Sequence, residues 1–247
     1  MASFATEKPR RAFPRFQTRI AIVGFWELSN PSSVRNRVDA HVLRFLALGD
    51  SYTIGEGVAQ AEGWPEQLVA LLRARGLGVA DPEIIAITGW TTDELAAGIE
   101  AAAPSGRYDL VSLLIGVNNQ YRGRTLGEYR AQFRALLTRA IAFAGGNPSR
   151  VIVLSIPDWG VTPFAKGRDR ALIAREIGAF NTVNREETAA AGADYTDITA
   201  ITRAHPNELT TDGLHPSAAL YARWAELVLD SATAALSVPS SPPNRES

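Results

Sequence analysis

The sequence of 247 residues contains no cysteine. Disulfide bonds, thiolate metal sites and a cysteine nucleophile are therefore excluded. Histidine is also scarce: His41, His205 and His215 are the only three, and they are too scattered to predict a histidine-built metal site. The formal net charge is only -1 at pH 7. Because such a chain has no long-range attraction for nucleic acid or an anionic membrane, we expect neither as a partner.

Long apolar runs are absent as well. No run approaches the roughly 20 residues needed to span a bilayer, so we expect no integral membrane segment. The best candidate for a secretory signal is residues 20–26, but Arg19 and Glu27 bound it closely. Glu27 also stands where a small-residue cleavage site should follow. We therefore expect a cytoplasmic protein, with export as the alternative.

The two ends of the chain differ from the part between them. Residues 1–42 are rich in arginine and have no sustained periodicity, which predicts a poorly ordered basic extension; a partner-binding or export segment is the alternative. Residues 238–247 are rich in serine and proline and predict a disordered tail. Residues 43–237 are then expected to form a single domain.

Within that domain, short apolar runs alternate with amphipathic segments. Strands are predicted at residues 45–48, 83–88, 109–115 and 151–156, with a weaker fifth at 195–198. Helices are predicted around residues 67–75, from 92, at 126–143 and 169–191, and from Pro216 to 228. Strands that are apolar on both faces suit a position between two layers of helices. The pattern predicts an α/β fold with a mostly parallel central sheet of about five strands.

A serine follows the first predicted strand, in the segment Gly49-Asp50-Ser51-Tyr52. Ligands of such sheets bind at the carboxyl ends of the strands, so Ser51 is a candidate nucleophile. Alternatively, the glycine-rich loop binds a phosphate at the next helix N-terminus. The Gly-Lys-Ser/Thr of a P-loop and the dinucleotide pattern G-x-G-x-x-G are both missing here.

A partner for this serine is found near the other end of the chain. Asp212 and His215 are three residues apart in a predicted loop before the last helix. This spacing lets the carboxylate fold back onto imidazole Nδ1, leaving Nε2 free to take a proton from a serine hydroxyl. As isolated residues, either one could equally be a helix cap.

Two further features suit an oxyanion hole. Gly89 follows the second predicted strand, where a glycine permits close approach of the backbone to a ligand. The third strand ends in Gly116-Val117-Asn118-Asn119, which puts an amide side chain at the same edge. Asn118 and the N–H groups of Ser51 and Gly89 would then bind an oxyanion, each worth about 3–4 kcal/mol in the transition state. Turn-forming roles are the alternative for each residue alone.

Together these motifs resemble the SGNH hydrolases, also called GDSL-type lipases and esterases, over approximately residues 44–230. The resemblance implies a three-layer flavodoxin-like fold with no metal or organic cofactor. It also implies Ser51 as nucleophile and oxyanion donor, Gly89 and Asn118 as the other donors, and His215 with Asp212 completing a triad.

Two positions depart from the family pattern. Tyr52 stands where the family's name has leucine, and Asn119 stands where many members carry aspartate. Both positions are outside the proposed catalytic set, so the implied mechanism is unaffected, but a close subfamily cannot be assigned.

The expected function is therefore a serine ester hydrolase that acts on small carboxylic esters, short-chain or acetyl, through an acyl-enzyme. Thioester hydrolysis and carbohydrate deacetylation are alternatives that use the same site. An inert protein that binds acyl groups or glycans on the same scaffold is a third, and a nucleotide-binding flavodoxin-like protein is a fourth.

Several neighbouring residues have open roles. Trp90 either walls the acyl pocket or belongs to the core, while Trp159 and Phe164 are expected at the pocket rim. Arg122 is expected in a solvated loop. Asp50 is expected to organise hydrogen bonds in its own loop.

Overall fold

The computed structural model describes residues 42–237. The predicted tail 238–247 and all but the last residue of the predicted extension 1–42 lie outside the described residues. Five parallel strands form one sheet in the order β2-β1-β3-β4-β5. They are β1 (Phe45–Gly49), β2 (Glu83–Ala86), β3 (Leu110–Leu114), β4 (Val151–Leu154) and β5 (Asp194–Thr196). The predicted α/β class with a parallel five-stranded sheet is confirmed.

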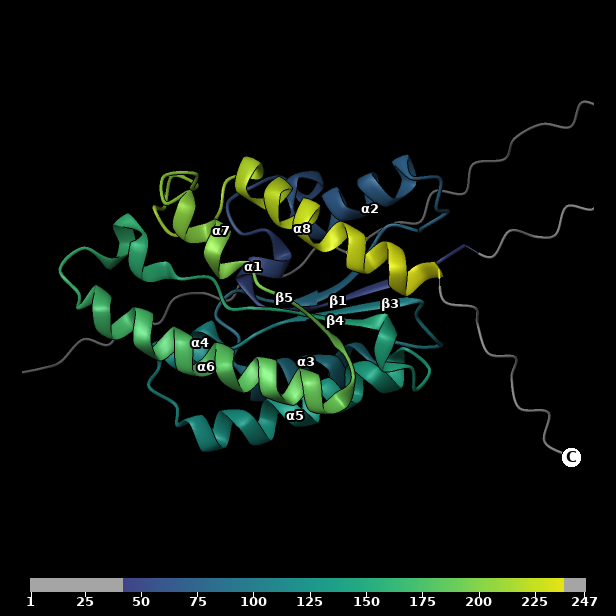
Figure 1. Cartoon of the computed structure of the whole chain (residues 1–247), viewed down its shortest axis with the longest axis horizontal. Helices are drawn as coiled ribbons and strands as arrows, with labels where there is room; N and C mark the ends of the chain where they lie inside the picture. The colour runs from purple at the N-terminus through teal and green to yellow at the C-terminus, as the bar shows by residue number, and fades with distance from the viewer. Residues whose placement is uncertain (1–41, 238–247) are drawn as a thin grey trace, which may run out of the picture. The chain divides into compact units, whose positions relative to one another are not determined.

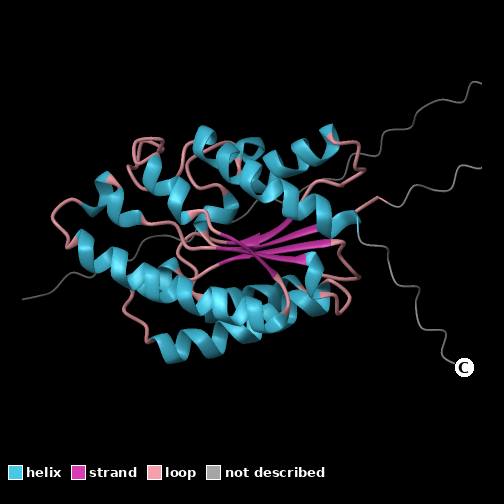
Figure 2. Cartoon of the chain, viewed as in Figure 1, coloured by secondary structure: helices cyan, strands magenta, loops and turns pink. Residues whose placement is uncertain are grey.

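Helices cover both faces of this sheet (Figure 1). The α-helices are α1 (Ser51–Ile54), α2 (Trp64–Ala74), α3 (Thr92–Ala102), α4 (Val117–Tyr121), α5 (Leu126–Phe143), α6 (Arg170–Ala191), α7 (Thr199–Ala204) and α8 (Ala218–Ser237). Short 3-10 turns occur at Gln60–Glu62, Pro148–Arg150, Trp159–Val161 and Pro163–Ala165. Helices α2 and α8 pack together on one face, and α3, α5 and α6 lie on the other. Figure 2 shows the strands enclosed between these two layers.

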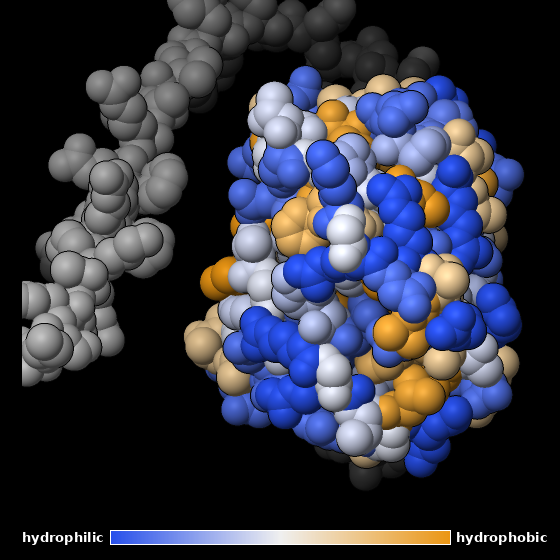
Figure 3. All heavy atoms as spheres, turned by 90° about the vertical axis from the view of Figure 1, so that its left-hand side faces the viewer, coloured by the Kyte–Doolittle hydropathy of each residue, from blue (hydrophilic) through white to orange (hydrophobic). Residues whose placement is uncertain are grey.

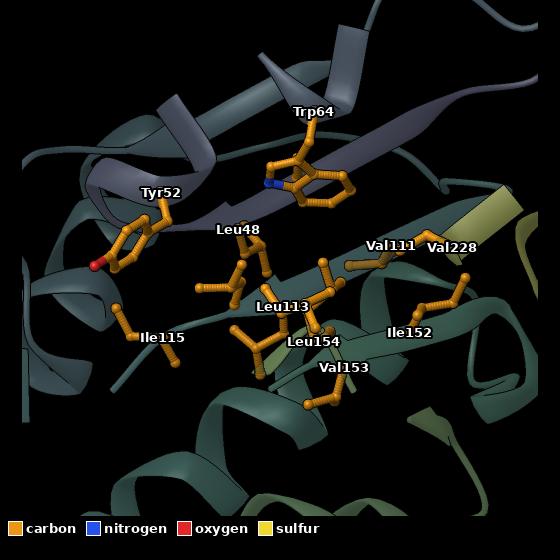
Figure 4. Packing of buried hydrophobic residues seen from close by; sticks show 14 of the residues in the cluster. Leu48, Tyr52, Trp64, Val111, Leu113, Ile115, Ile152, Val153, Leu154 and Val228 are labelled. Atoms are coloured by element: carbon orange, nitrogen blue, oxygen red, sulfur yellow. The ribbon is translucent and has the colours of Figure 1, made fainter. Parts of the chain in front are cut away.

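The core lies on both faces of the central strands. Every residue of β1, β3 and β4 is buried, as expected for strands between two helical layers. Figure 4 shows part of this core, with Trp64 of α2 and side chains of β1, β3 and β4 in view. Burying one such Leu or Val stabilises the fold by about 1.5–3 kcal/mol. None of the helices within residues 42–237 is long and apolar enough to cross a bilayer.

The last helix begins later than the sequence predicts. Pro216 is not in its first turn, because the residue pairs with Leu209 in an antiparallel bridge. Backbone bonds from Thr210 N to His215 O (2.8 Å) and from Ser217 N to Glu208 O (2.9 Å) hold the same ladder. Helix α8 therefore starts at Ala218, and residues 209–216 form a closed loop in front of it.

The strand order creates a switch point between β1 and β3. The chain leaves β1 through α2 on one face, returns through β2, and reaches β3 through α3 on the other face. Binding sites in open α/β sheets form at the carboxyl ends of strands flanking such a point. The carboxyl ends point to the left in Figure 1, so Figure 3 views this edge; hydrophobic surface forms separate patches there among hydrophilic side chains.

Candidate active site

Ser51 is the first residue of α1, directly beyond the carboxyl end of β1. Asp50 caps this short helix, since its Oδ1 accepts a hydrogen bond from Tyr52 N at 3.1 Å. The expectation that Asp50 organises its own loop is confirmed by this bond. Only glycine fits at position 49, because a Cβ there would lie 2.1 Å from Thr53 Oγ1 and 2.5 Å from the Leu114 carbonyl oxygen. Tight packing between β1, β3 and α1 thus fixes the serine at the sheet edge.

Ser51, His215 and Asp212 form a continuous hydrogen-bonded chain. Ser51 Oγ lies 2.9 Å from His215 Nε2, and His215 Nδ1 lies 2.6 Å from Asp212 Oδ2. Both Ser51 and His215 are buried. Because a carboxylate can only accept, Nδ1 carries the proton and Nε2 is left to accept the serine hydroxyl. The residues predicted from two distant motifs therefore meet in the order that a base-activated serine requires.

The Asp212 carboxylate is held by four donors. Its Oδ1 accepts from Thr210 Oγ1 (2.7 Å), Leu214 N (2.8 Å) and His215 N (3.0 Å), while Oδ2 faces His215 Nδ1. Partial burial raises the pKa of Asp212, but the hydrogen bonds from His215, Leu214 and Thr210 outweigh it and hold the pKa well below its usual range. The group is therefore ionised at neutral pH and fixes the imidazole. Gly213, at φ 68°, allows the turn that brings these donors around.

Gly89 and Asn118 lie beside the serine, as the sequence predicts. Both line one pocket with Ser51. Gly89 adopts φ 87° in a turn closed by a bond from Trp90 N to Ile87 O at 3.2 Å. Within residues 42–237, the N–H groups of Ser51 and Gly89 have no protein acceptor. Asn118 Nδ2 donates to Trp90 O at 3.0 Å, which uses one of its two amide hydrogens and leaves the other.

Arg122 and Asn119 have contacts that the sequence did not predict. Arg122 is exposed in the turn after α4, as expected, and in addition its Nη2 donates to Gly89 O at 2.5 Å and its Nη1 lies 3.2 Å from Glu94. Asn119 is fully buried: its Oδ1 accepts from Thr92 N (3.1 Å) and its Nδ2 donates to Thr92 Oγ1 (2.7 Å). The spacing of four between Asn118 and Arg122, which puts both on one helix face, was the available indication.

The pocket in front of Ser51 is small and part of its wall is aromatic. Its volume is about 160 Å³. Trp159 and Phe164 line it, as predicted, together with Tyr121. The other lining residues are Ser51, Tyr52, Thr88, Gly89, Val117, Asn118, Leu214 and His215. The three rings of the wall contact one another, with centroids 5.5 Å apart for Tyr121–Trp159 and 5.9 Å for Trp159–Phe164.

Trp90, whose role the sequence left open, is not among the residues that line this pocket. It packs onto α3, where a Cβ at Gly98 would lie 2.1 Å from the indole ring. The orientation of Trp159 is fixed by Gln120, whose Oε1 accepts a hydrogen bond from Trp159 Nε1 at 2.8 Å. Trp90 therefore contributes to packing against α3, whereas Trp159 forms part of the pocket wall.

Another carboxylate near the site is engaged elsewhere. Asp158 accepts from Arg203 Nε (2.8 Å) and Gly160 N (2.9 Å), which leaves Asp212 as the partner of His215. In the described part of the chain, no three His, Asp or Glu side chains gather closely enough to hold a metal ion. The chemistry that this arrangement supports is proton transfer from a serine hydroxyl beside two or three N–H donors.

Known proteins share this architecture. The structure of TesA is similar at a TM-score of 0.62 and 22% identity, over 78% of this chain and 99% of that chain. Axe2, an acetylxylan esterase from Geobacillus stearothermophilus, gives 0.63 and 22%, over 77% and 94% of the two chains. The psychrotrophic esterase EstA from Pseudoalteromonas sp. gives 0.58 and 19%, over 76% and 95%. At these identities the likeness shows the fold.

The sequence itself decides the family. A comparison with curated proteins finds no match. The profile of the GDSL-like Lipase/Acylhydrolase family, however, matches residues 47–223, which is well over half of the chain. That span contains the elements bearing Ser51, Gly89, Asn118 and His215. The chain thus belongs to the GDSL-like lipase/acylhydrolase family and is an ester hydrolase.

Proposed function

We propose that the protein hydrolyses short-chain or acetyl carboxylic esters through a Ser51-His215-Asp212 triad and an acyl-enzyme. The observation that carries this proposal is the hydrogen-bonded chain from Ser51 Oγ through His215 to Asp212, opening into a small pocket. Membership of the acylhydrolase family supports the same chemistry.

In the first step, His215 Nε2 takes the Ser51 proton as Oγ attacks the ester carbonyl carbon. The carbonyl oxygen becomes an oxyanion that accepts hydrogen bonds from Ser51 N–H, Gly89 N–H and the remaining amide hydrogen of Asn118. Each donor of this kind is worth about 3–4 kcal/mol in the transition state. The bond to the alcohol oxygen then breaks, and the imidazolium delivers its proton to the departing alcohol.

In the second step, water attacks the acyl-enzyme. His215 Nε2 takes a proton from the water, whose oxygen bonds to the acyl carbon, and the same three donors bind the new oxyanion. Collapse of this intermediate breaks the bond to Ser51 Oγ, which recovers its proton from the imidazolium. Asp212 remains ionised through both steps and stabilises each imidazolium as it forms.

The size of the pocket supports small acyl groups. Its volume of about 160 Å³ is below the roughly 300–1,000 Å³ typical of pockets for drug-sized ligands. The aromatic rings of Tyr121, Trp159 and Phe164 form part of its wall and limit its extent. We therefore expect acetate and propionate esters to react faster than octanoate and longer esters.

The test is hydrolysis of a chain-length series of 4-nitrophenyl esters. Ser51→Ala and His215→Ala should each lower kcat by about 10⁴-fold or more, because nucleophile and base act as a unit. Ser149→Ala and His205→Ala, which lie outside the pocket, serve as matched controls and should keep wild-type rates. A phosphonate should label Ser51 alone, as detected by peptide mass spectrometry.

Wild-type rates in a folded Ser51→Ala protein would rule out the triad. A wild-type enzyme that is fastest on long-chain esters would instead reject the short-chain preference and leave the triad intact.

A further inference from the structure

We propose that Arg122 is a positioning residue for the oxyanion hole, holding the turn of residues 87–90 so that Gly89 N–H faces the pocket. The inference rests on the proposed function. Side chains of helix α4 and of Arg122, the residue at its C-cap, bind three nearby backbone positions. Arg122 donates to Gly89 O (2.5 Å), Asn118 to Trp90 O (3.0 Å), and Asn119 accepts from Thr92 N (3.1 Å).

The guanidinium of Arg122 is itself anchored on the segment that follows the turn. Its Nη1 lies 3.2 Å from both carboxylate oxygens of Glu94. Glu94 in turn caps α3, with Oε2 accepting from Thr91 N at 2.9 Å and from Thr91 Oγ1 at 3.0 Å. Helix α4, the 87–90 turn and the start of α3 therefore form one closed ring of contacts, in which Arg122 bonds to both other members.

The turn needs such support because glycine has the most freely rotating backbone of any residue. Gly89 has φ 87°, and a Cβ built on it would find only Arg122 Nη2 within 4 Å, at 3.7 Å. Apart from the two chain neighbours, nothing else in residues 42–237 comes that close, so Gly89 is loosely packed on this side. Within residues 42–237, Arg122 is also the one hydrogen-bond donor to Gly89 O. Without the Arg122 side chain, the turn would be held only by the two hydrogen bonds of Trp90, from its N–H to Ile87 O and from Asn118 to its carbonyl oxygen.

The expected consequence is kinetic. A donor displaced by about 1 Å from a developing oxyanion can cost up to 10²-fold in rate. Because Asn118 and Asn119 still hold the flanking residues, we expect a smaller loss for Arg122, near 10-fold. The loss should fall on kcat, since the oxyanion exists in the transition state and not in the bound ester. The ion pair with Glu94 is exposed and adds little to stability.

Arg124 offers a matched control on the same surface. It is as exposed as Arg122, at 39% against 41%, and pairs with Glu128 at 3.0 Å and Asp93 at 3.9 Å. Within residues 42–237, its side chain makes no hydrogen bond or ion pair to the 87–90 turn. Replacing it breaks a comparable ion pair while leaving Gly89 O bonded.

The experiment compares Arg122→Ala, Arg122→Lys and Arg124→Ala with the wild type on 4-nitrophenyl acetate. Arg122→Ala should lower kcat about 10-fold with KM within twofold, and slow inactivation by a phosphonate in parallel. Arg122→Lys should recover part of kcat, since the ammonium can bond Gly89 O but cannot also bind both Glu94 oxygens. Arg124→Ala should match the wild type, and the Tm of every variant should stay within about 2 °C.

Three results would overturn the inference while leaving the proposed function intact. A raised KM with unchanged kcat in Arg122→Ala would mean that Arg122 binds substrate directly. Equal losses in Arg122→Ala and Arg124→Ala would mean a general effect of surface charge. If activity depends on Ser51 but the kinetics of Arg122→Ala are unchanged, the positioning role of Arg122 is rejected and the proposed function stands. Full activity in Ser51→Ala, measured alongside, would instead reject the proposed function and this inference with it.

Discussion

Asp50 and Asp212 border the same serine–histidine pair but lie in opposite environments. Asp50 is completely buried; one oxygen accepts from Tyr52 N, and Oδ2 has no hydrogen-bond partner within the described residues. Burial raises its pKa to about 7. The Asp212 side chain is 43% exposed, meets four donors, and has a pKa well below its usual range.

The comparison explains which carboxylate can serve the histidine. Ionisation is decided by the donors and solvent around a carboxylate, and not by its closeness to the nucleophile along the chain. Asp50 is adjacent to Ser51 in sequence but gains little from carrying a charge. Asp212 is stabilised as an anion and can balance a developing imidazolium. Three changes test this contrast.

The largest effect is expected for Asp212→Asn. The amide would donate to Nδ1, leaving the proton on Nε2 and removing its ability to accept from Ser51. In a serine triad such a change costs about 10⁴-fold in kcat. Steady-state hydrolysis of 4-nitrophenyl acetate measures it, and Asp169→Asn, at the N-cap of α6, is the control. A loss below 10-fold would remove Asp212 from the triad.

Asp50→Asn should change stability in a pH-dependent way. Between pH 4 and 7 the folded protein holds a proton on Asp50 that the unfolded chain has released, so stability falls as pH rises through this window. Below pH 4 both states are protonated and the contribution vanishes. Asparagine keeps the N-cap without the charge. The stability of the variant relative to wild type should therefore rise as the pH is raised from 5 to 8.

Thermal unfolding followed by circular dichroism at both pH values measures this difference. A Tm difference between variant and wild type that is the same at pH 5 and pH 8 would contradict the raised pKa of Asp50.

The smallest effect is expected for Thr210→Val. It removes one of the donors to Asp212 Oδ1 while keeping the shape that packs against Gly57. A hydrogen bond to a charged group is worth about 1.5–3 kcal/mol, but three other donors still hold this carboxylate, so kcat should fall only about threefold. The readout is kcat on 4-nitrophenyl acetate across pH 5–9. A loss comparable to that of Asp212→Asn would show that the donors around Asp212 do not act independently.

The sequence allowed most of the fold to be predicted, because it depends on local patterns. Helix α5 has the predicted bounds Leu126–Phe143, and all five strands occur where apolar runs were found. Strand β2 ends two residues before its predicted end, β3 one residue before and β4 two residues before. The predicted runs are longer because they continue into the loops that follow these strands. The residues of the four motifs were predictable as candidates because each motif is short and contiguous.

Other features depended on contacts between distant segments. Nothing local to Pro216 indicates that Leu209 will pair with it, so the predicted start of the last helix at Pro216 was wrong. Arg122 meets Gly89 across 33 positions of sequence, a contact that no periodicity encodes. Asn119 and Thr92 are likewise brought together only by the packing of α4 against the start of α3.

The distance along the chain between the proposed nucleophile and the proposed base has a consequence for how activity would arise. Ser51 and His215 are 164 positions apart, and His215 lies in the loop held closed just before α8. Helix α8, which follows this loop, packs on α2, the first long helix after Ser51, and on strands β3, β4 and β5. A ribosome-bound chain that ends before residue 215 contains all five strands but lacks the proposed base. Esterase activity therefore reports on completed folding, and reassociation of separated N- and C-terminal fragments would be visible as the appearance of turnover.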